Sequence, residues 1–244
     1  MIVAEIGLNH MGDRKMLEHF LYTLTNSKVD AITLQIRESE FYENSRWEKY
    51  RLVEMLYVKA SKQVRKSGKQ FGLAISDKHL IPHLRGYCDF FKILSKDLSD
   101  TEILNTFKNS EVKCYLSTGN SSFDQIEEAL KYLNSNTTLI HTRLDNGVDK
   151  VNLSAIKTMK NTFSEPIAFG NHCQNLNVIY AAIPFQPSDY FFYVKDNTYE
   201  VPPDDKHAID LQNVDKVCQN IVQLNQSIGS GLKYESENSI EGQL

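Results

Sequence analysis

The chain has 244 residues, of which 41% are hydrophobic and 24% charged, and its formal net charge is −4. These are ordinary globular values, so a large core can form and wholesale disorder is excluded. The acidic balance argues against a nucleic-acid binder, which needs a basic surface, and no apolar run reaches the ~18 residues that a membrane helix needs.

The N-terminal residues lack the basic and apolar regions of a secretory signal, so we expect no export. The cysteines, Cys88, Cys114, Cys173 and Cys218, are far apart and form no CxxC motif. At this chain length a disulfide framework is not expected. The sequence therefore predicts reduced thiols in a cytoplasmic protein.

Short apolar runs rich in β-branched residues alternate with helical patterns along the whole chain. The runs predict eight strands: Ile2–Ile6, Ala31–Ile36, Gln70–Ile75, Asp89–Leu94, Val112–Leu116, Thr137–Thr142, Pro166–Phe169 and Asp189–Val194. The clearest helical patterns are residues 13–27, 122–133, 152–163 and 210–224. Asp13 is the expected cap of the first, and Ser122 with Gln125 forms a capping box at the second.

Strict alternation of strands and helices predicts a parallel sheet, and eight such units predict a closed (β/α)8 TIM barrel over residues 1–226. The alternative is an open, doubly wound sheet. The first strand is not followed by the GxGxxG motif of a dinucleotide site, which weakens that alternative. Residues 227–244 are rich in Gly, Ser and other polar residues and predict a linker or tail.

One connection stands out by its length and polarity. Residues 37–46, RESEFYENSR, follow the second predicted strand and suit either a lid over the barrel mouth or a plain exposed loop. The next residues, beginning at Trp47, favour a helix start over a sugar-binding surface. Lys206 and His207 lie in a polar loop near the end of the chain, and exposure is the expected state of both.

Polar and ionisable residues stand at nearly every carboxyl end of the predicted strands, where barrel active sites form. An inward lysine such as Lys92 needs a counter-ion because an unpaired buried charge is costly, and Glu5 and Asp97 are the candidates. We expect five side chains to converge on one cavity at this end of the barrel: Glu5, Lys92, Ser117, His141 and His172.

Several segments of the chain resemble the N-acetylneuraminate (sialic acid) synthase family, over about residues 2–231. They are AEIGLNHMGD at the start, AITLQ, FFKILSKDLSD, YLSTGNSSFDQIEEAL, VNLSAIKTMKNTF, and the NH after the seventh strand. The resemblance implies condensation of phosphoenolpyruvate with an N-acylated amino-sugar aldehyde, in the synthesis of surface polysaccharides. It also implies a divalent metal, Mn or Mg, that polarises the aldehyde.

The resemblance assigns roles to individual residues. Catalytic roles fall on Glu5, Lys92 and Asp97, of which Asp97 stands where the family contacts the aldehyde substrate. Substrate-binding roles fall on Gln35, Ser95, Ser117 and Lys195. Arg143 has no counterpart in the family, but an arginine at the mouth can bind carboxylate or phosphate in a bidentate way. His172 matches a metal-binding histidine.

The chain departs from the family at the donor and metal sites. A lysine of the family is Thr33 here, a threonine is Ala74 and a serine is Gly170. The second metal histidine aligns with Asp196, whose carboxylate could bind Mn or Mg, or with Tyr193 in an ungapped alignment. Unless Arg37 or Arg143 reaches in, we therefore expect metal-dependent binding of a sugar carbonyl with weak or no phosphoenolpyruvate turnover.

The family pairs through an antifreeze-like domain that follows the barrel, and the present sequence ends soon after the barrel. We therefore expect either a homodimer through barrel helices or a complex with a second subunit. The preferred interpretation is a sugar-acid synthase with a small-molecule sugar substrate. The alternatives are a metal-dependent lyase or condensing enzyme with a changed donor, and a catalytically inactive barrel that partners a full-length synthase.

Overall fold

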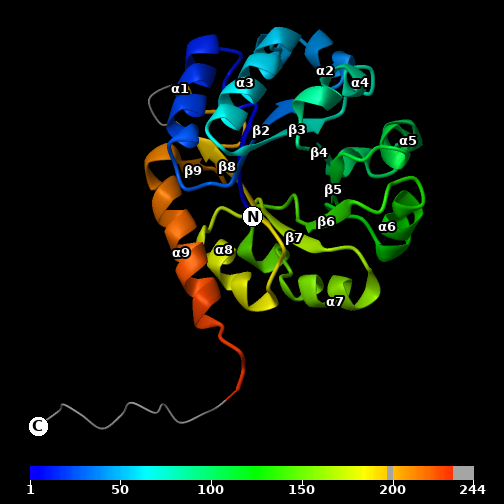
Figure 1. The fold of residues 1–244 in the computed structure, drawn as a ribbon, viewed down its shortest axis with the longest axis vertical. Coiled ribbons are helices and arrows are strands. Elements are labelled where there is room, and N and C mark those ends of the chain that lie inside the picture. Colours follow the sequence, from blue (N-terminus) through cyan, green and yellow to red (C-terminus); the bar gives the residue numbers. More distant parts are fainter. Residues whose placement is uncertain (197–199, 233–244) are drawn as a thin grey trace, which may run out of the picture.

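The computed structural model describes residues 1–196 and 200–232. Eight parallel strands pair in chain order, and β1 also pairs with β8, which closes the barrel. Figure 1 shows the helices arranged around these strands. The strands are β1 (Ile2–Gly7), β2 (Ala31–Ile36), β3 (Gln70–Ile75), β4 (Phe90–Ile93), β5 (Lys113–Ser117), β6 (Thr137–His141), β7 (Ile167–Asn171) and β8 (Tyr190–Lys195). The predicted TIM barrel is confirmed, and the open sheet is wrong.

The helices follow the predicted alternation. They are α1 (Arg14–Thr25), α2 (Ser39–Glu43), α3 (Glu54–Lys66), α4 (Ile81–Leu84), α5 (Thr101–Lys108), α6 (Phe123–Leu130), α7 (Ser154–Thr162), α8 (Asn177–Ala181) and α9 (Val214–Ser227). Asp13 caps α1 by accepting from the amide of Met16, and the capping box of Ser122 and Gln125 is present at α6. A short β9 (Ile209–Asp210) pairs with β8 before α9 begins.

Side chains that point into the barrel form a first, apolar layer. It consists of Val3, Ala31, Phe90, Tyr115, Ile140, Ala168 and Phe191. Its rings make edge-to-face contacts, with centroids 5.2 Å apart for Phe90 and Tyr115 and 4.9 Å apart for Tyr115 and Phe191. Because side chains alternate along a strand, the residue two positions later points the same way and forms the next layer, toward the carboxyl ends.

The loop after β2 is partly buried rather than plainly exposed. It contains α2 and a short 3-10 turn, Glu48–Tyr50, and its buried Tyr42 and Tyr50 pack with Leu8 of the β1–α1 loop. Gly12, at φ +75°, admits this close packing, since a Cβ there would lie 1.6 Å from the carbonyl oxygen of Lys49. The loop therefore packs against the barrel mouth through Tyr42 and Tyr50, whereas residues 43–46 are exposed.

The four cysteines are buried and free, as expected. None of the helices in the described ranges combines the length and apolar character needed to cross a bilayer. The predicted tail, residues 227–244, lies mostly outside the described residues: α9 ends at Ser227, and the description stops at residue 232.

Candidate active site

A buried ion pair lies in the second inward layer. The ammonium of Lys92 is 2.5 Å from the Oε1 atom of Glu5, and each side chain keeps only 3% of its surface exposed. Lys92 follows Phe90 by two residues on β4, and Glu5 follows Val3 by two on β1, so strand alternation places both inward. The prediction that Lys92 has an acidic counter-ion is confirmed for Glu5. Buried ion pairs rarely add stability, which favours a role in binding or catalysis.

The loop between β8 and β9 brings a second carboxyl group to this pair. The backbone amide of Asp204 donates to Oδ1 of Asn9 over 3.1 Å, and Nδ2 of Asn9 donates to the carbonyl oxygen of Val194 over 2.8 Å. The carboxyl lies over Gly7, at φ +57°, where a Cβ would come within 3.1 Å of Oδ2 of Asp204. Burial raises the pKa of Asp204 to about 7, and the charge of Glu5 adds to this against the opposing effect of Lys92.

The same loop carries a histidine that stacks on the predicted metal ligand. The rings of His207 and His172 are 4.7 Å apart, and Tyr193 meets both edge-on. Burial, together with the charge of Lys92, lowers the pKa of His207 to about 4. Burial also lowers the pKa of His172 well below its usual value, so both rings are neutral at pH 7. Both ring nitrogens of His207 are buried without a hydrogen-bond partner.

The expected exposure of His207 is therefore wrong, whereas Lys206 is exposed as expected. Sequence reasoning missed His207 and Asp204 as site residues because an irregular loop has no periodicity that marks a buried face.

The predicted metal pair is not brought together. Oδ2 of Asp196 lies 2.9 Å from Nε2 of His19 on α1, whereas His172 contacts Tyr193 and His207. Side chains alternate along β8, so Phe191 and Tyr193 point into the barrel. Asp196 follows the last residue of β8, and its side chain points away from the barrel interior. Within residues 1–196 and 200–232, no three His, Cys, Asp or Glu side chains gather as a metal cluster. The side chains present therefore do not fit a metal held by His172 and Asp196.

Two of the predicted substrate-binding residues, Ser95 and Ser117, lie in contact. The hydroxyls of Ser95 and Ser117 are 2.8 Å apart, at the ends of β4 and β5. Gly119, at φ +51°, lets the β5–α6 turn approach Ser95, since a Cβ there would lie 2.6 Å from the Cβ of Ser95. The hydroxyls of Thr33 and Thr142 are buried without partners. The side chains around the two serines therefore provide neutral hydroxyls and add no cation to Lys92.

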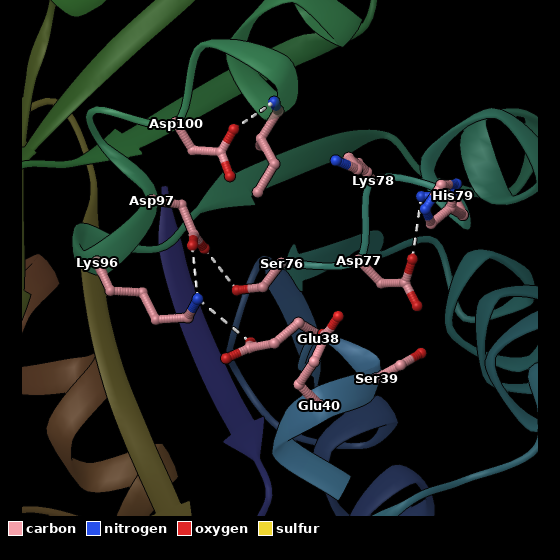
Figure 2. Close-up of a pocket in the computed structure, with 11 residues that line it drawn as sticks. Glu38, Ser39, Glu40, Ser76, Asp77, Lys78, His79, Lys96, Asp97 and Asp100 are labelled. Atoms are coloured by element: carbon pink, nitrogen blue, oxygen red, sulfur yellow. Dashed lines mark hydrogen bonds and ion pairs between the residues drawn. The ribbon is translucent and has the colours of Figure 1, made fainter. Parts of the chain in front are cut away.

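A cavity of about 280 Å³ opens at the ends of β2, β3 and β4. Figure 2 shows Asp97 in this cavity, where its carboxylate accepts from the hydroxyl of Ser76 at 2.5 Å and pairs with Lys96 at 2.6 Å. Lys96 also pairs with Glu38, at 3.2 Å. Acidic side chains outnumber basic ones in the lining: Glu38, Glu40, Asp77, Asp97 and Asp100 against Lys78 and Lys96.

The short 3-10 turn Ser95–Asp97 connects the two parts of the site. Its first residue contacts Ser117 and its last contacts Ser76, so one turn of chain separates the serine pair from the acidic cavity. Gln35, at the end of β2, is buried. Asp97 is thus a residue of the cavity, and Glu5 alone of the two candidates pairs with Lys92.

Three other cations near the mouth have acidic partners. Arg37 pairs with Glu38 at 3.0 Å, and Arg143 with Asp145 at 3.4 Å. Lys195 pairs with Asp205 at 2.8 Å. All three partners are residues of the surrounding loops. The charge of Arg37 nevertheless reaches the mouth, where it opposes the burial that raises the pKa of Tyr193.

The predicted convergence of His141 on the cavity is wrong. Ile140 belongs to the inward layer, so the next residue on β6 faces outward. His141 is buried there against the ring of Phe169, with Nε2 3.0 Å from the carbonyl oxygen of Val151. It supports the β6–α7 connection from outside the barrel.

Comparisons with known proteins agree with this fold. The model of the NeuB family matches residues 19–233. The N,N'-diacetyllegionaminic acid synthase of Campylobacter jejuni is 24% identical, over 97% of this chain and 80% of its own length. Among solved structures, an N-acetylneuraminic acid synthetase from Leptospira borgpetersenii superposes with a TM-score of 0.88 at 23% identity, over 97% of this chain and 87% of that one. A spore coat polysaccharide biosynthesis protein E from Chromobacterium violaceum gives 0.83 at 18% identity, over 97% and 78%.

Proposed function

The chain belongs to the NeuB family, and we propose that it is a sugar-acid synthase that joins an enolpyruvyl donor to the carbonyl carbon of an amino sugar. The names of its relatives support this reading, since they include legionaminic acid synthases and proteins of spore coat polysaccharide biosynthesis. The observation that carries the proposal is the buried pair of Lys92 and Glu5 beside the serine pair, at the catalytic end of the barrel.

In this proposal the donor lies against Lys92, Ser95 and Ser117. The ammonium attracts the donor's carboxylate, and the two hydroxyls donate hydrogen bonds to its oxygens. The acceptor sugar lies in the adjoining cavity, where Asp97 and Ser76 can accept and donate hydrogen bonds to sugar hydroxyls. The turn Ser95–Asp97 then holds both reactants next to each other, which supplies the proximity that bond formation needs.

Phosphoenolpyruvate should bind weakly to this site. Lys92 is already neutralised by Glu5, and Arg37, Arg143 and Lys195 are each paired with a carboxylate. Losing one charge-assisted contact to the phosphate costs about 1.5–3 kcal/mol. We therefore expect the affinity to be roughly tenfold to a hundredfold below that of a site with a free lysine.

The expected binding of a divalent metal, Mn or Mg, has the least support from the side chains of this chain. The neutral ring of His172 can bind a metal, but Asp196 lies against His19. We therefore assign no step to a metal. Metal content and calorimetry of the wild type and of His172→Ala measure this part separately from turnover.

The direct test of the function is an assay with phosphoenolpyruvate and a panel of N-acylated amino sugars. Phosphate release and mass spectrometry of a nine-carbon keto acid report the condensation. We expect turnover in the wild type and none in Lys92→Met. Absence of product with every sugar, with and without Mn, would refute the proposal.

A second candidate, an inactive barrel that assists a full-length synthase, is favoured by one observation. Lys92 and Glu5 keep only 3% of their surface exposed, so the ion pair itself offers little surface to a substrate. This candidate predicts a heteromeric complex, whereas an active synthase predicts a homodimer through its barrel helices. Light scattering, and co-purification with a full-length synthase, separate the two assemblies.

A further inference from the structure

Asp204 is the most exposed of the three charged side chains around the buried ion pair. Its side chain keeps 23% of its surface exposed, while Glu5 and Lys92 below it keep 3% each. Its backbone is fixed by the hydrogen bond to Asn9, and its carboxyl is seated over Gly7. It therefore presents a carboxyl group, held in one place, at the open side of the buried ion pair.

Charged and titratable groups face this carboxyl from each neighbouring element. They are Glu5 on β1, Lys92 on β4, Tyr193 on β8, and His207 of the same loop, whose Nε2 is 3.8 Å from Oδ1. Burial and the charge of Glu5 raise the pKa of Asp204 to about 7, although Lys92 opposes them. Near neutral pH the group therefore holds a proton in part of the molecules and can release it, as a general acid must.

We propose that Asp204 is a catalytic residue, the proton donor to the oxygen of the sugar carbonyl; this inference rests on the proposed function. The electron pair of the donor's enol double bond forms the new carbon–carbon bond, and the carbonyl pair moves onto oxygen. That oxygen takes the proton of Asp204 and becomes a hydroxyl. Asp204 is left as a carboxylate.

Water then adds to the former enol carbon, and the proton that the water loses returns to Asp204. The carbon–oxygen bond to phosphate breaks, and its electron pair and the remaining hydroxyl proton leave as hydrogen phosphate. The products are a keto acid and phosphate, and Asp204 is again protonated. Both proton transfers thus use one group, which begins and ends the cycle in the same state.

The test compares Asp204→Asn with the wild type, using phosphoenolpyruvate and N-acetylmannosamine or whichever N-acylated amino sugar the panel identifies. Asparagine keeps the shape and the backbone bond to Asn9 but carries no titrating proton. We expect kcat to fall roughly 10²–10⁴-fold, with KM for both substrates within about threefold. In the wild type kcat should decline above about pH 7, and the variant should lose this decline. Glu127→Gln on the exposed face of α6 is the matched control and should retain it.

A second readout does not depend on turnover. Carbon-13 NMR of labelled carboxyl groups should show one aspartate that titrates near pH 7 in the wild type and in Glu127→Gln, and that is missing from Asp204→Asn. An unchanged kcat and pH profile in Asp204→Asn, with an active wild type, would overturn this inference alone. A wild type without any condensation activity would overturn the proposed function and this inference with it.

Discussion

The two inward layers of the barrel lie two residues apart on the same strands and have opposite chemistry. In the first layer Val3, Phe90 and Phe191 pack against other apolar groups. Two positions later the same strands present Glu5, Lys92 and Tyr193. The strand alternation that builds the apolar core therefore also places the site residues. Two positions along a strand lead from a core residue to a residue of the site.

The difference extends to hydrogen bonding. Aromatic contacts join the members of the first layer, in which the buried hydroxyl of Tyr115 lacks a partner, whereas the second layer and its covering loop hold unpartnered polar atoms on Thr33, Thr142 and His207. A buried polar atom without a partner costs about 1–3 kcal/mol. The mouth therefore contains polar atoms whose hydrogen bonds a polar ligand can supply. The apolar layer beneath it contributes the stability.

Removing the charge of Lys92 should have the largest effect on the mouth layer. In Lys92→Met we expect activity to fall at least ~10³-fold and stability to fall by about 3–5 kcal/mol, because Glu5 stays buried without a counter-ion. The double variant Glu5→Gln with Lys92→Met should recover most of the stability and none of the activity. Urea unfolding and the condensation assay measure the two effects. Undiminished activity in Lys92→Met would remove this lysine from the site.

Truncating the apolar layer should lower stability by a similar amount but leave the activity largely unchanged. Phe90→Ala leaves a cavity beneath the mouth and should cost about 3–5 kcal/mol of stability. Activity per folded molecule should remain within roughly tenfold of the wild type, since Phe90 offers no polar group to the reaction. Denaturant titration with far-ultraviolet circular dichroism gives the stability, and kcat below the transition gives the activity. A loss of kcat as large as that of Lys92→Met would mean that the layers are not separable.

Asp204 should make the mouth less stable as the pH rises. Its pKa is about 7 in the folded chain against 3.8 as the ordinary value, so between these values the unfolded chain releases a proton that the folded chain keeps. Stability from this group therefore falls from about pH 4 to about pH 7. Asp204→Asn should be more stable than the wild type by about 2–4 kcal/mol at pH 8. At about pH 4 the two should be nearly equal. Equal melting temperatures at both pH values would contradict the shift.

The barrel was predictable from the sequence because regular elements leave regular patterns. Alternating apolar runs gave the strands, and Asp13 and Ser122 gave helix starts. The pairing of Lys92 followed from the cost of a buried charge, which needs no knowledge of loops. The meeting of Ser95 with Ser117 followed from the resemblance and from neighbouring strands.

The remainder of the site depends on contacts that no local pattern encodes. Asp204 and His207 are positioned by a hydrogen bond to Asn9 and by a ring stack on His172, both distant in sequence. His141 was misplaced because polarity near a strand end was counted without the alternation set by Ile140. Asp196 aligned with a metal ligand by sequence, but the chain turns it toward α1.

The smallest expected effect comes from restoring one hydroxyl to the mouth. Gly170 points inward on β7, two residues after Ala168, and a Cβ there would lie 2.9 Å from Cγ2 of Ile140 and 3.6 Å from Oγ1 of Thr142. Ile140 must therefore shift by a few tenths of an ångström, which should cost about 1 kcal/mol in both Gly170→Ser and Gly170→Ala. The serine alone adds a donor, and one hydrogen bond worth about 0.5–1.5 kcal/mol should tighten phosphoenolpyruvate binding roughly threefold to tenfold. Calorimetric titration of both variants isolates the hydroxyl, because the alanine carries the same steric cost without it. Equal affinities in the two variants would show that phosphoenolpyruvate does not reach this side of the polar layer.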